Sequence, residues 1–527
     1  MDTSPPSANR QIAQAAGTVM IAFVISNLAG LLRQVLVANA FGTQAEMEAF
    51  NAANRVSETL FTLVAGGALS SAFIPTFTGL LAKEKQAHAW KLASAIANLV
   101  LIVLSLAALL AAIFAPQITR YILAPGFAGD AVKEQLTIDL LRLMLPSAVI
   151  FGLSGLVMGI LNSHRRFLIP ALTPAMYQIG LIVGVVFLAP EMGIYGLAYG
   201  VLLGSAMHLI LQLPSLRRLG GHFEWTFGIN IPEVREVIRL MGPRLLGVAV
   251  VQLNFWINTR LASQMIEGSV TGIVLAFSLM LMPQAAIAQS IAIAAMPMFS
   301  AQVALGRLDE MRGAMIASLR AAIMLSLPAA VGLILLREPI IVSLYQRGAF
   351  DEFSTQLVSW ALLWYSAGLI GHAVVEILSR AFYSLHDTKT PVLVGALAMS
   401  LNILFSYLFS ALFARWGWMP HGGLALANSL ATGLEAIALW WVMRHRMQGL
   451  PVKRVLIGAA QAGFCALLMG FSLWIWLQAS TQLLSWQVAL WGIILGAVVF
   501  SFSALVLKIP ELQTLRNAVW KRIGARS

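Results

Sequence analysis

The stretch SNLAGLLRQVLVANAFGTQAEMEAFNAANRVSETLFTLVAGGALSSAFIPTF, residues 26–77, decides how this chain folds. It contains two largely apolar segments that carry polar side chains at positions expected to lie inside a membrane. Ionisable groups are costly within a bilayer, so those that occur there usually face a cavity and have a function. We therefore expect the two segments to form one wall of a polar cavity in a membrane protein.

The composition of the whole chain is that of a helical membrane protein. Hydrophobic residues make up 59% of the 527 residues and charged residues 11%, and the mean hydropathy is +0.82. Apolar runs of about 20 residues recur along the chain, and this length crosses a bilayer as an α-helix. The runs are too long and continuous for barrel strands, in which apolar residues alternate. The predicted fold class is an all-α polytopic membrane protein.

The apolar runs predict 14 transmembrane helices. The expected spans are 17–40, 48–82, 92–115, 138–161, 170–190, 193–213, 244–265, 270–303, 313–336, 356–382, 391–414, 421–443, 455–477 and 484–507.

The distribution of Lys and Arg predicts the orientation of these helices. Of the 34 basic residues, 24 lie at one set of span ends, and only six lie at the other. The positive-inside rule makes the first set cytoplasmic, together with both termini. An even number of spans requires the same arrangement of the termini. The net charge of +12 follows from this bias, so we expect no nucleic-acid partner.

The chain contains an internal repeat with a period of about 222 residues. Pro75 within the second span is matched by Pro297 in the eighth, and Pro170 is matched by Pro391. Two further pairs occur in the same order: Gly126-Phe127 with Gly348-Ala-Phe350, and Gly196-Leu-Ala with Gly423-Leu-Ala.

The repeat predicts two parallel six-helix bundles related by an axis along the membrane normal, an arrangement of transporters that work by alternating access. The predicted domains are 1–223 for spans 1–6, 224–447 for spans 7–12, and 448–527 for two accessory spans and a basic cytoplasmic tail.

The polar residues of the opening stretch recur at steps of three and four, which places each set on one helical face. The candidate substrate-binding residues are Asn27, Arg33, Gln34, Glu48, Asn54, Arg55, Glu58 and, from the seventh span, Arg260. We expect the three arginines to lie at similar depth and to converge on one anionic group, because a guanidinium binds phosphate oxygens in pairs.

Simpler interpretations of the same residues stay open. Arg55 and Glu58 are three positions apart on one helix and can neutralise each other. Arg33 can pair with a nearby glutamate, namely Glu46, Glu48 or Glu58. Alternatively, its side chain can extend to the membrane–water interface, as that of Arg260 can near the end of its span.

Two glutamates and several helix-breaking residues lie within other spans. Glu376 and Glu435 are candidates for binding a coupling cation or proton, or are packing residues that are protonated or hydrogen-bonded. The predicted hinges are Gly66, Gly67, Pro75 and Pro297.

The sequence contains one enzyme signature. Gly152-Leu-Ser154-Gly155 matches the GxSG pattern of intramembrane serine proteases, with His208 and His372 as the histidines inside spans. Small residues within a span usually form packing surfaces, so we favour packing over catalysis. The single cysteine and the absence of metal-binding sequence motifs predict no metal and no cofactor.

Several sequence motifs, read in order, resemble one family. They are LLRQVLVANAFG (31–42), GALSSAFIPTF (67–77), LAPGF (123–127), NSHRRFLIPALTP (162–174), LYQRGAFDEFST (344–355) and FYSLHDTKTPVLV (382–394). Together with Glu48-Ala-Phe50, they are similar to the MurJ/MviN lipid II flippases of the multidrug/oligosaccharidyl-lipid/polysaccharide exporter superfamily.

The resemblance implies outward movement of a lipid-linked peptidoglycan precursor across the bacterial inner membrane. The pyrophosphate and sugar would occupy the central cavity, and the lipid tail would lie along a groove by spans 13 and 14. The implied partners are the undecaprenyl-pyrophosphate-linked substrate, membrane lipids and other cell-wall synthesis proteins.

The family's charged positions carry over only in part. Arg33 and Glu48 match, whereas three family arginines fall on Asn27, Phe61 and Ser278. Arg55 and Arg260 are hypothesised to compensate. The alternatives are a cation-coupled exporter of another polyprenyl-linked glycan or a small amphipathic compound and, more remotely, the intramembrane serine protease.

Overall fold

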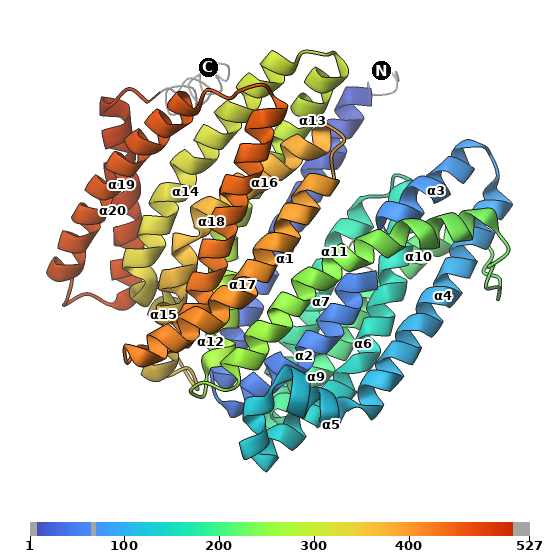
Figure 1. Ribbon diagram of the computed structural model, residues 1–527. Coiled ribbons are helices and arrows are strands. Elements are labelled where there is room, and N and C mark those ends of the chain that lie inside the picture. The colour runs from blue at the N-terminus through green and yellow to red at the C-terminus, as the bar shows by residue number, and fades with distance from the viewer. Residues whose placement is uncertain (1–7, 65–69, 510–527) are drawn as a thin grey trace, which may run out of the picture. The chain divides into compact units, whose positions relative to one another are not determined.

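A computed structural model describes residues 8–64 and 70–509, and within these ranges the secondary structure is helical, with no strand. This confirms the predicted all-α fold class. The chain folds into two compact units (Figure 1). The first comprises residues 1–267 and 347–350, and the second comprises 268–346 and 351–527.

The first unit contains the long helices that carry the opening stretch. Its elements are α1 (Ala8–Phe41), α2 (Ala45–Val64), α3 (Ser70–Ala82), α4 (Gln86–Ile113), α5 (Ala115–Gln117), η2 (Ile118–Leu123), η3 (Pro125–Gly129), α6 (Ala131–Ser163), α7 (Leu168–Val183), η4 (Gly184–Leu188), α8 (Ala189–Met192), α9 (Ile194–Ile210), α10 (Leu213–Arg217) and α11 (Pro232–Ala262).

The second unit is built from α12 (Ser269–Gln284), η5 (Ala285–Gln289), α13 (Ser290–Ala304), α14 (Leu308–Tyr345), α15 (Glu352–Ala367), α16 (Leu369–Ser384), α17 (Lys389–Arg415), α18 (His421–Arg446), α19 (Val452–Ala479) and α20 (Ser485–Val506). Within it, α14 packs against both α19 and α20.

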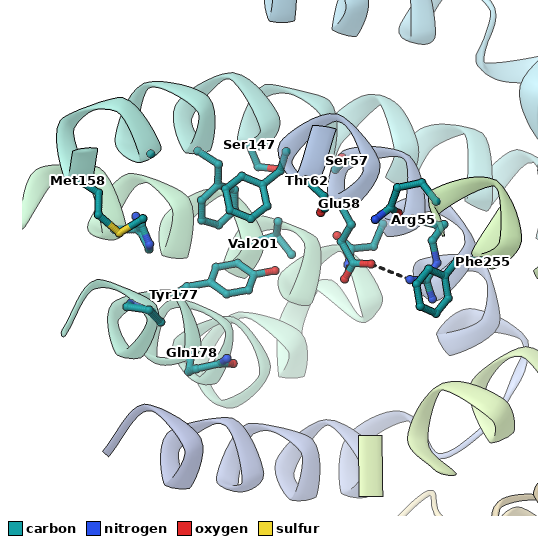
Figure 2. Close-up of a pocket in the computed structure, with 17 residues that line it drawn as sticks. Arg55, Ser57, Glu58, Thr62, Ser147, Met158, Tyr177, Gln178, Val201 and Phe255 are labelled. Carbon is teal, nitrogen blue, oxygen red and sulfur yellow. Dashed lines mark hydrogen bonds and ion pairs between the residues drawn. The ribbon is translucent and has the colours of Figure 1, made fainter. Parts of the chain in front are cut away.

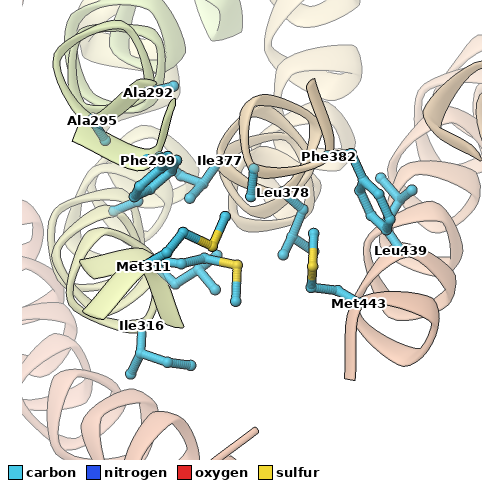
Figure 3. Packing of buried hydrophobic residues seen from close by; sticks show 14 of the residues in the cluster. Ala292, Ala295, Phe299, Met311, Ile316, Ile377, Leu378, Phe382, Leu439 and Met443 are labelled. Carbon is cyan, nitrogen blue, oxygen red and sulfur yellow. The ribbon is translucent and has the colours of Figure 1, made fainter. Parts of the chain in front are cut away.

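Each unit has an apolar core where its helices meet. In the first unit, Phe73 and Phe77 of α3 pack with Leu92 of α4 and Ile160 of α6. In the second unit, aromatic, aliphatic and methionine side chains of α13, α14, α16 and α18, among them Phe299, Met311 and Phe382, form one buried cluster (Figure 3). Methionine suits such a core because its flexible side chain fills irregular gaps between helices.

Within residues 8–64 and 70–509, 11 helices are long and apolar enough to cross a membrane, or up to 13 if each of two bent pairs forms one span. The bent pairs are residues 232–242 with 247–262, and 352–367 with 369–384. The expected second span, 48–82, crosses residues 65–69, which lie outside the described part of the chain. The count of 14 therefore stays a prediction.

The division by contacts differs from the division by sequence repeat. Helix α11 belongs to the first compact unit, because it packs on α2, α3 and α4. The repeat assigns the same helix to the second bundle. The compact units describe which helices contact one another, whereas the repeat describes which segments are similar in sequence. The domain boundary predicted between residues 223 and 224 therefore stays a prediction.

Two glycines permit a close backbone contact within the first unit. The N–H of Ala349 donates to the carbonyl of Asn39 at 2.9 Å. Gly42 and Gly348 beside this bond have φ of +55° and +60°. A Cβ atom added at Gly42 would lie 2.3 Å from the carbonyl oxygen of Ala349. A Cβ atom added at Gly348 would lie 2.4 Å from the carbonyl oxygen of Asn39. Glycine is thus required twice where the segment LLRQVLVANAFG meets Arg347–Phe350.

Candidate functional site

A cavity of about 610 Å³ lies within the first unit, between helices α2, α6, α7, α9 and α11. Aromatic and amide side chains make up much of its wall. The lining residues are Asn54, Arg55, Ser57, Glu58, Phe61, Thr62, Ser147, Phe151, Gly155, Met158, Pro174, Tyr177, Gln178, Val201, His208, Gln252 and Phe255. Figure 2 shows Tyr177 pointing toward Glu58 across this space.

Glu58 organises the polar side of the cavity. Its carboxylate accepts hydrogen bonds from Asn54 Nδ2 and from an Arg55 guanidinium nitrogen, each at 3.0 Å. The Arg55 guanidinium also lies over the Phe255 ring, 5.1 Å from its centroid, a favourable cation–π arrangement. The structure therefore brings three predicted site residues together. Their geometry is that of the simpler interpretation, in which Glu58 neutralises Arg55 on the same helix.

Helix α11 is fixed to α2 beside this group. Thr59 Oγ1 accepts from Trp256 Nε1 at 2.8 Å and shares its own proton between the Arg55 carbonyl, at 2.7 Å, and Gln252 Oε1, at 3.2 Å. Thr59 and Gln252 are buried, and buried polar groups paired in this way hold two helices in one register. This pairing positions Gln252 and Phe255 in the cavity wall.

Arg33 lies near the cavity without belonging to its lining. Gly30, one turn before it on α1, packs on α7, where a Cβ atom would lie 3.6 Å from Gln178 Nε2. Helix α1 packs along α7, which carries Tyr177 and Gln178 of the cavity wall. Within the described ranges, Arg33 forms no hydrogen bond or ion pair. Its charge is thus less compensated than that of Arg55.

Asn27 and Gln34 lie on the same helix as Arg33, outside the cavity lining. Asn27 is exposed and Gln34 is half-buried. Each of the two takes part in an interaction within the structure. Their predicted contact with substrate stays a prediction.

Glu48 occupies a different, buried environment. Its carboxylate pairs with Lys133 Nζ of α6 at 2.5 Å, and the two residues are 2% and 8% exposed. The α6 helix begins here because Asp130 accepts from the backbone N–H groups of Val132 and Lys133. The structure thus joins Glu48 to α6, away from the cavity lining.

Arg260 also lies apart from the cavity. Its guanidinium donates to the carbonyl of Tyr121 in the π-helical element η2. It is not among the lining residues, so the structure does not bring Arg33, Arg55 and Arg260 together around this space. A guanidinium bound to a main-chain carbonyl fixes the loop next to the end of α11.

The two candidate coupling glutamates belong to the second unit. Glu376 pairs with Arg380 one turn later at 2.9 Å. Glu435 is half-buried and forms no hydrogen bond within the described part of the chain. It faces α17, where a Cβ atom on Gly395 would lie 3.2 Å from Glu435 Oε1. Their role in coupling stays a prediction.

The predicted hinges are only partly visible. Gly66 and Gly67 lie outside the described residues. Pro75 lies inside α3 and Pro297 inside α13, both exposed. Pro283, in the last turn of α12, lies two residues before the π-helical turn η5, so the backbone hydrogen-bond pattern changes beside a proline.

Ser154 and His208, from the protease-like pattern, are in contact. Ser154 Oγ lies 2.6 Å from His208 Nδ1, and both side chains are buried. His372 instead approaches Asn428 Oδ1 at 3.2 Å in the second unit. The sequence places Ser154 and His208 on separate helices, and only the packing of α6 on α9 brings them together.

Sequence reasoning missed the contribution of α7 and α9 to the cavity. Tyr177 and Gln178 are polar residues within the apolar helix α7, and His208 is the polar lining residue of α9. Their polarity is a usable signal, but no charge accompanies it. An apolar run with one amide gives no indication of the helix that the amide faces.

The second unit holds an apolar cavity of about 470 Å³. Its lining comes from α12, α14, α19 and α20 and includes Pro283, Pro328, Leu336, Leu473 and Phe500. Gly492 and Gly496 of α20 open this space, because a glycine leaves room where a side chain would otherwise stand. The chemistry of the lining fits a hydrocarbon chain.

Comparison with known proteins decides the family. The sequence model described as lipid II flippase MurJ matches residues 37–494. The chain belongs to the MurJ family. The lipid II flippase MurJ of Burkholderia cenocepacia is 30% identical over 432 residues, covering 80% of this chain and 82% of the relative. The probable lipid II flippase MurJ of Vibrio cholerae is 30% identical over 512 residues, covering 94% and 96%.

Solved structures agree with MurJ membership. A lipid II flippase MurJ in an inward closed conformation superposes with a TM-score of 0.80 at 25% identity, covering 93% of this chain and 98% of that one. An inward-facing multidrug resistance MATE transporter of the MOP superfamily has a TM-score of 0.68 at 17% identity, with 80% and 94% covered. The second likeness concerns the fold alone. The resemblance inferred from the sequence motifs is confirmed.

Proposed function

We propose that this chain is a lipid II flippase, a transporter and not an enzyme, which moves the lipid-linked peptidoglycan precursor from the inner to the outer leaflet. The observation that carries the proposal is the MurJ family match over residues 37–494. The many apolar helices supply the multi-pass membrane architecture that such a transporter needs.

The cavity of the first unit is the proposed site for the polar head of the substrate. It combines amides, hydroxyls and aromatic rings with one guanidinium and one carboxylate. Such a mixture suits a ligand with sugar and phosphate parts, because aromatic faces cover apolar ring surfaces and amides pair with hydroxyls. Arg33, on the helix that packs along α7, is the proposed contact for a pyrophosphate oxygen.

The apolar cavity of the second unit is the proposed site for the lipid tail. Its walls include α19 and α20, which are the two helices outside the sequence repeat. A polyprenyl chain has no polar group to satisfy, so apolar walls and small residues are sufficient to hold it. Transport would then proceed by alternating access, with the predicted hinges absorbing the motion.

The alternatives predict different behaviour. A cation-coupled exporter of small amphipathic compounds needs no separate tail site, and MurJ membership favours lipid II over it. The protease requires a reactive, accessible serine, whereas Ser154 is 0% exposed. Cation coupling of the flippase itself, through Glu376 or Glu435, is part of the proposal.

Localisation and partners complete the proposal. The basic span ends support a bacterial inner-membrane protein with both termini in the cytoplasm. Besides membrane lipids and the lipid-linked anionic substrate, other cell-wall synthesis proteins are proposed partners.

The test is replacement of a known flippase. A bacterial strain is depleted of its own lipid II flippase while this chain is expressed, and growth and the arrival of labelled lipid II in the outer leaflet are measured. We expect both to be restored, and Arg33→Ala to abolish the rescue. A chain that inserts at normal levels and restores neither would contradict the proposed substrate.

A further inference from the structure

A buried hydrogen-bonded group lies at the cavity wall, apart from the charged residues of α2. It consists of Ser154 on α6, His208 on α9 and Gln212 in the turn between α9 and α10. Their side chains are 0%, 6% and 0% exposed, and His208 also lines the cavity. Buried polar side chains are retained when their hydrogen bonds are satisfied, so the arrangement of these bonds carries information about His208.

The orientation of the Gln212 amide is set by its neighbours. Gln212 Nε2 donates to the main-chain carbonyl of His208 at 2.9 Å and to Ser154 Oγ at 2.6 Å, with a longer contact to the Ser154 carbonyl at 3.4 Å. The opposite orientation would place the amide oxygen against carbonyl oxygens, which only accept. Ser154 Oγ therefore accepts a hydrogen bond from the Gln212 amide.

The Ser154 hydroxyl has one proton of its own to donate. His208 Nδ1, at 2.6 Å from Ser154 Oγ, is placed to accept it. A neutral imidazole that accepts at Nδ1 carries its proton on Nε2. The pair of hydrogen bonds thus selects one tautomer, with the free N–H at the other end of the ring.

The surroundings of the ring indicate where this N–H is used. Nε2 of His208 has no hydrogen-bond partner within the described part of the chain. The ring lies 5.4 Å from the Phe151 ring in an edge arrangement, and Phe151 in turn lies 5.0 Å from Tyr177. Phe151 and Tyr177 both line the cavity. A neutral donor beside aromatic rings suits an uncharged sugar oxygen better than a phosphate, whose charge needs a cation.

We propose that Ser154 and Gln212 hold His208 as the Nε2–H tautomer, so that His208 donates a hydrogen bond from the cavity wall to a neutral oxygen of the substrate's amino sugar. This rests on the proposed function of the cavity as the site of the polar head. Ser154 and Gln212 are positioning residues, and His208 is a specificity-determining contact. The serine of the protease-like pattern thus orients a histidine.

The tautomer is tested directly by nitrogen NMR of the full chain, labelled with 15N-histidine and embedded in lipid nanodiscs. A His208→Phe difference spectrum identifies the His208 signals. We expect a protonated Nε2 and a bare Nδ1, and we expect Ser154→Ala to give a mixture of tautomers that Ser154→Thr does not give. The exposed His386 serves as the internal reference. A proton on Nδ1 of His208 in the unmodified chain would overturn the inference.

The ligand is tested with two soluble probes, N-acetylglucosamine and inorganic pyrophosphate. We expect the amino sugar to shift the His208 Nε2 signal and pyrophosphate to leave it unchanged. His208→Phe should weaken amino-sugar binding about tenfold, as the loss of one hydrogen bond to a buried donor does. His208→Gln, whose amide supplies a donor near the same place, should restore most of the binding.

The outcomes separate this inference from the proposed function. A response to pyrophosphate alone, or to neither probe, in a chain that restores growth of the depleted strain overturns the role of His208 and leaves the flippase assignment standing. Failure of the unmodified chain to restore growth contradicts the flippase assignment. A His208 response to the amino sugar in that chain would still support the contact.

Discussion

Lys133 Nζ lies 2.5 Å from Glu48 Oε2, and both residues are buried between α2 and α6. Lys133 Nζ also lies 4.2 Å from the centroid of the Phe127 ring. The ammonium group is thus enclosed by a carboxylate and an aromatic face. Such a pair holds α2, which carries Asn54, Arg55 and Glu58, against the helix that forms the opposite wall of the cavity.

We predict that breaking this pair on one side destabilises the protein. Glu48→Gln leaves the Lys133 charge buried without its carboxylate, which costs about 3 to 5 kcal/mol. The double variant Glu48→Gln/Lys133→Met removes both charges and should recover most of the stability. Thermal unfolding of the detergent-solubilised protein measures both effects.

Glu46→Gln is the matched control, because Glu46 is exposed two positions earlier on the same helix. It should change the unfolding temperature little. If the double variant were as unstable as Glu48→Gln, an unpaired buried charge would not be the cause of the destabilisation.

The junction between Asn39 and Ala349 should not tolerate a side chain at either glycine. Gly42→Ala combines a left-handed backbone, which costs about 1 to 2 kcal/mol for an L-residue, with a Cβ atom 2.3 Å from a carbonyl oxygen. Gly348→Ala meets the same obstacle. Both variants should unfold at lower temperature and give less folded protein on expression.

Gly313→Ala tests whether the effect is local. Gly313 lies inside α14 with nothing within 4 Å of a new Cβ atom. Alanine is the better helix former by about 1 kcal/mol, so this variant should be as stable as the parent or more stable. Equal destabilisation at Gly313 and Gly42 would refute the close-approach argument.

Asp387, in the turn between α16 and α17, predicts a dependence of stability on pH. Its carboxylate accepts from the Thr390 hydroxyl at 2.6 Å, from the backbone N–H groups of Lys389 and Thr390, and from Arg446. Burial acts to raise the pKa of Asp387, but the hydrogen bonds from Thr390 and Arg446 outweigh it and lower the pKa to about 2.

A pKa lower in the folded than in the unfolded chain, where it is about 3.9, means that folding favours the ionised carboxylate. The stabilisation is fully present above about pH 4 and is lost as the pH falls toward 2. Asp387→Asn should therefore lower the unfolding temperature at pH 7, and the difference from the parent should shrink between pH 4 and 2. Asp309→Asn, at a side chain 92% exposed, should show a small, nearly constant difference. If the unfolding temperature of Asp387→Asn were still as far below that of the parent at pH 2 as at pH 7, this account would be contradicted.

Arg33 and Arg55 should differ in their importance for substrate binding. Arg55 is already paired with Glu58 at 3.0 Å, whereas Arg33 has no carboxylate partner among the described residues. We predict that Arg33→Gln weakens lipid II binding at least about tenfold, as the loss of a charge-assisted hydrogen bond of about 1.5 to 3 kcal/mol does. Arg55→Gln should have a smaller effect.

The measurement is binding of labelled lipid II to nanodisc-embedded protein at low and high salt. The affinity of the Arg33→Gln variant should depend less on salt than that of the parent, because one ionic contact is gone. A larger loss in Arg55→Gln than in Arg33→Gln would show that the paired arginine is the one that meets the substrate.

Particular residues show how far sequence reasoning reaches into the site. Asn54, Arg55 and Glu58 are predictable as one face because Glu58 lies about one turn after the adjacent Asn54 and Arg55, and helical periodicity fixes that relation within a segment. Glu48 is expected among the same substrate-binding residues, but it pairs with Lys133. Its partner is 85 positions away in the sequence, and no local sequence pattern predicts a contact between residues so far apart.

Aromatic and amide residues of apolar helices are the hardest part of the cavity to predict. Phe61 and Phe151 pack with ring centroids 4.8 Å apart, and Gln178 and Gln252 complete the wall from α7 and α11. Their side chains give no charge signal in a hydrophobic sequence, and apolar helices can pack through many alternative faces.

The membrane-helical fold class, the polar face of the opening stretch and the resemblance to the MurJ family can all be inferred from the sequence. They follow from hydropathy, helical periodicity and short motifs, all of which are local properties of the chain. Three features of the site come instead from the packing of the folded chain: Glu58 binds Asn54 and Arg55, Arg260 binds a main-chain carbonyl, and Ser154 contacts His208. The last two contacts join helices distant in sequence, and side-chain packing selects them from many pairings of similar hydrophobicity.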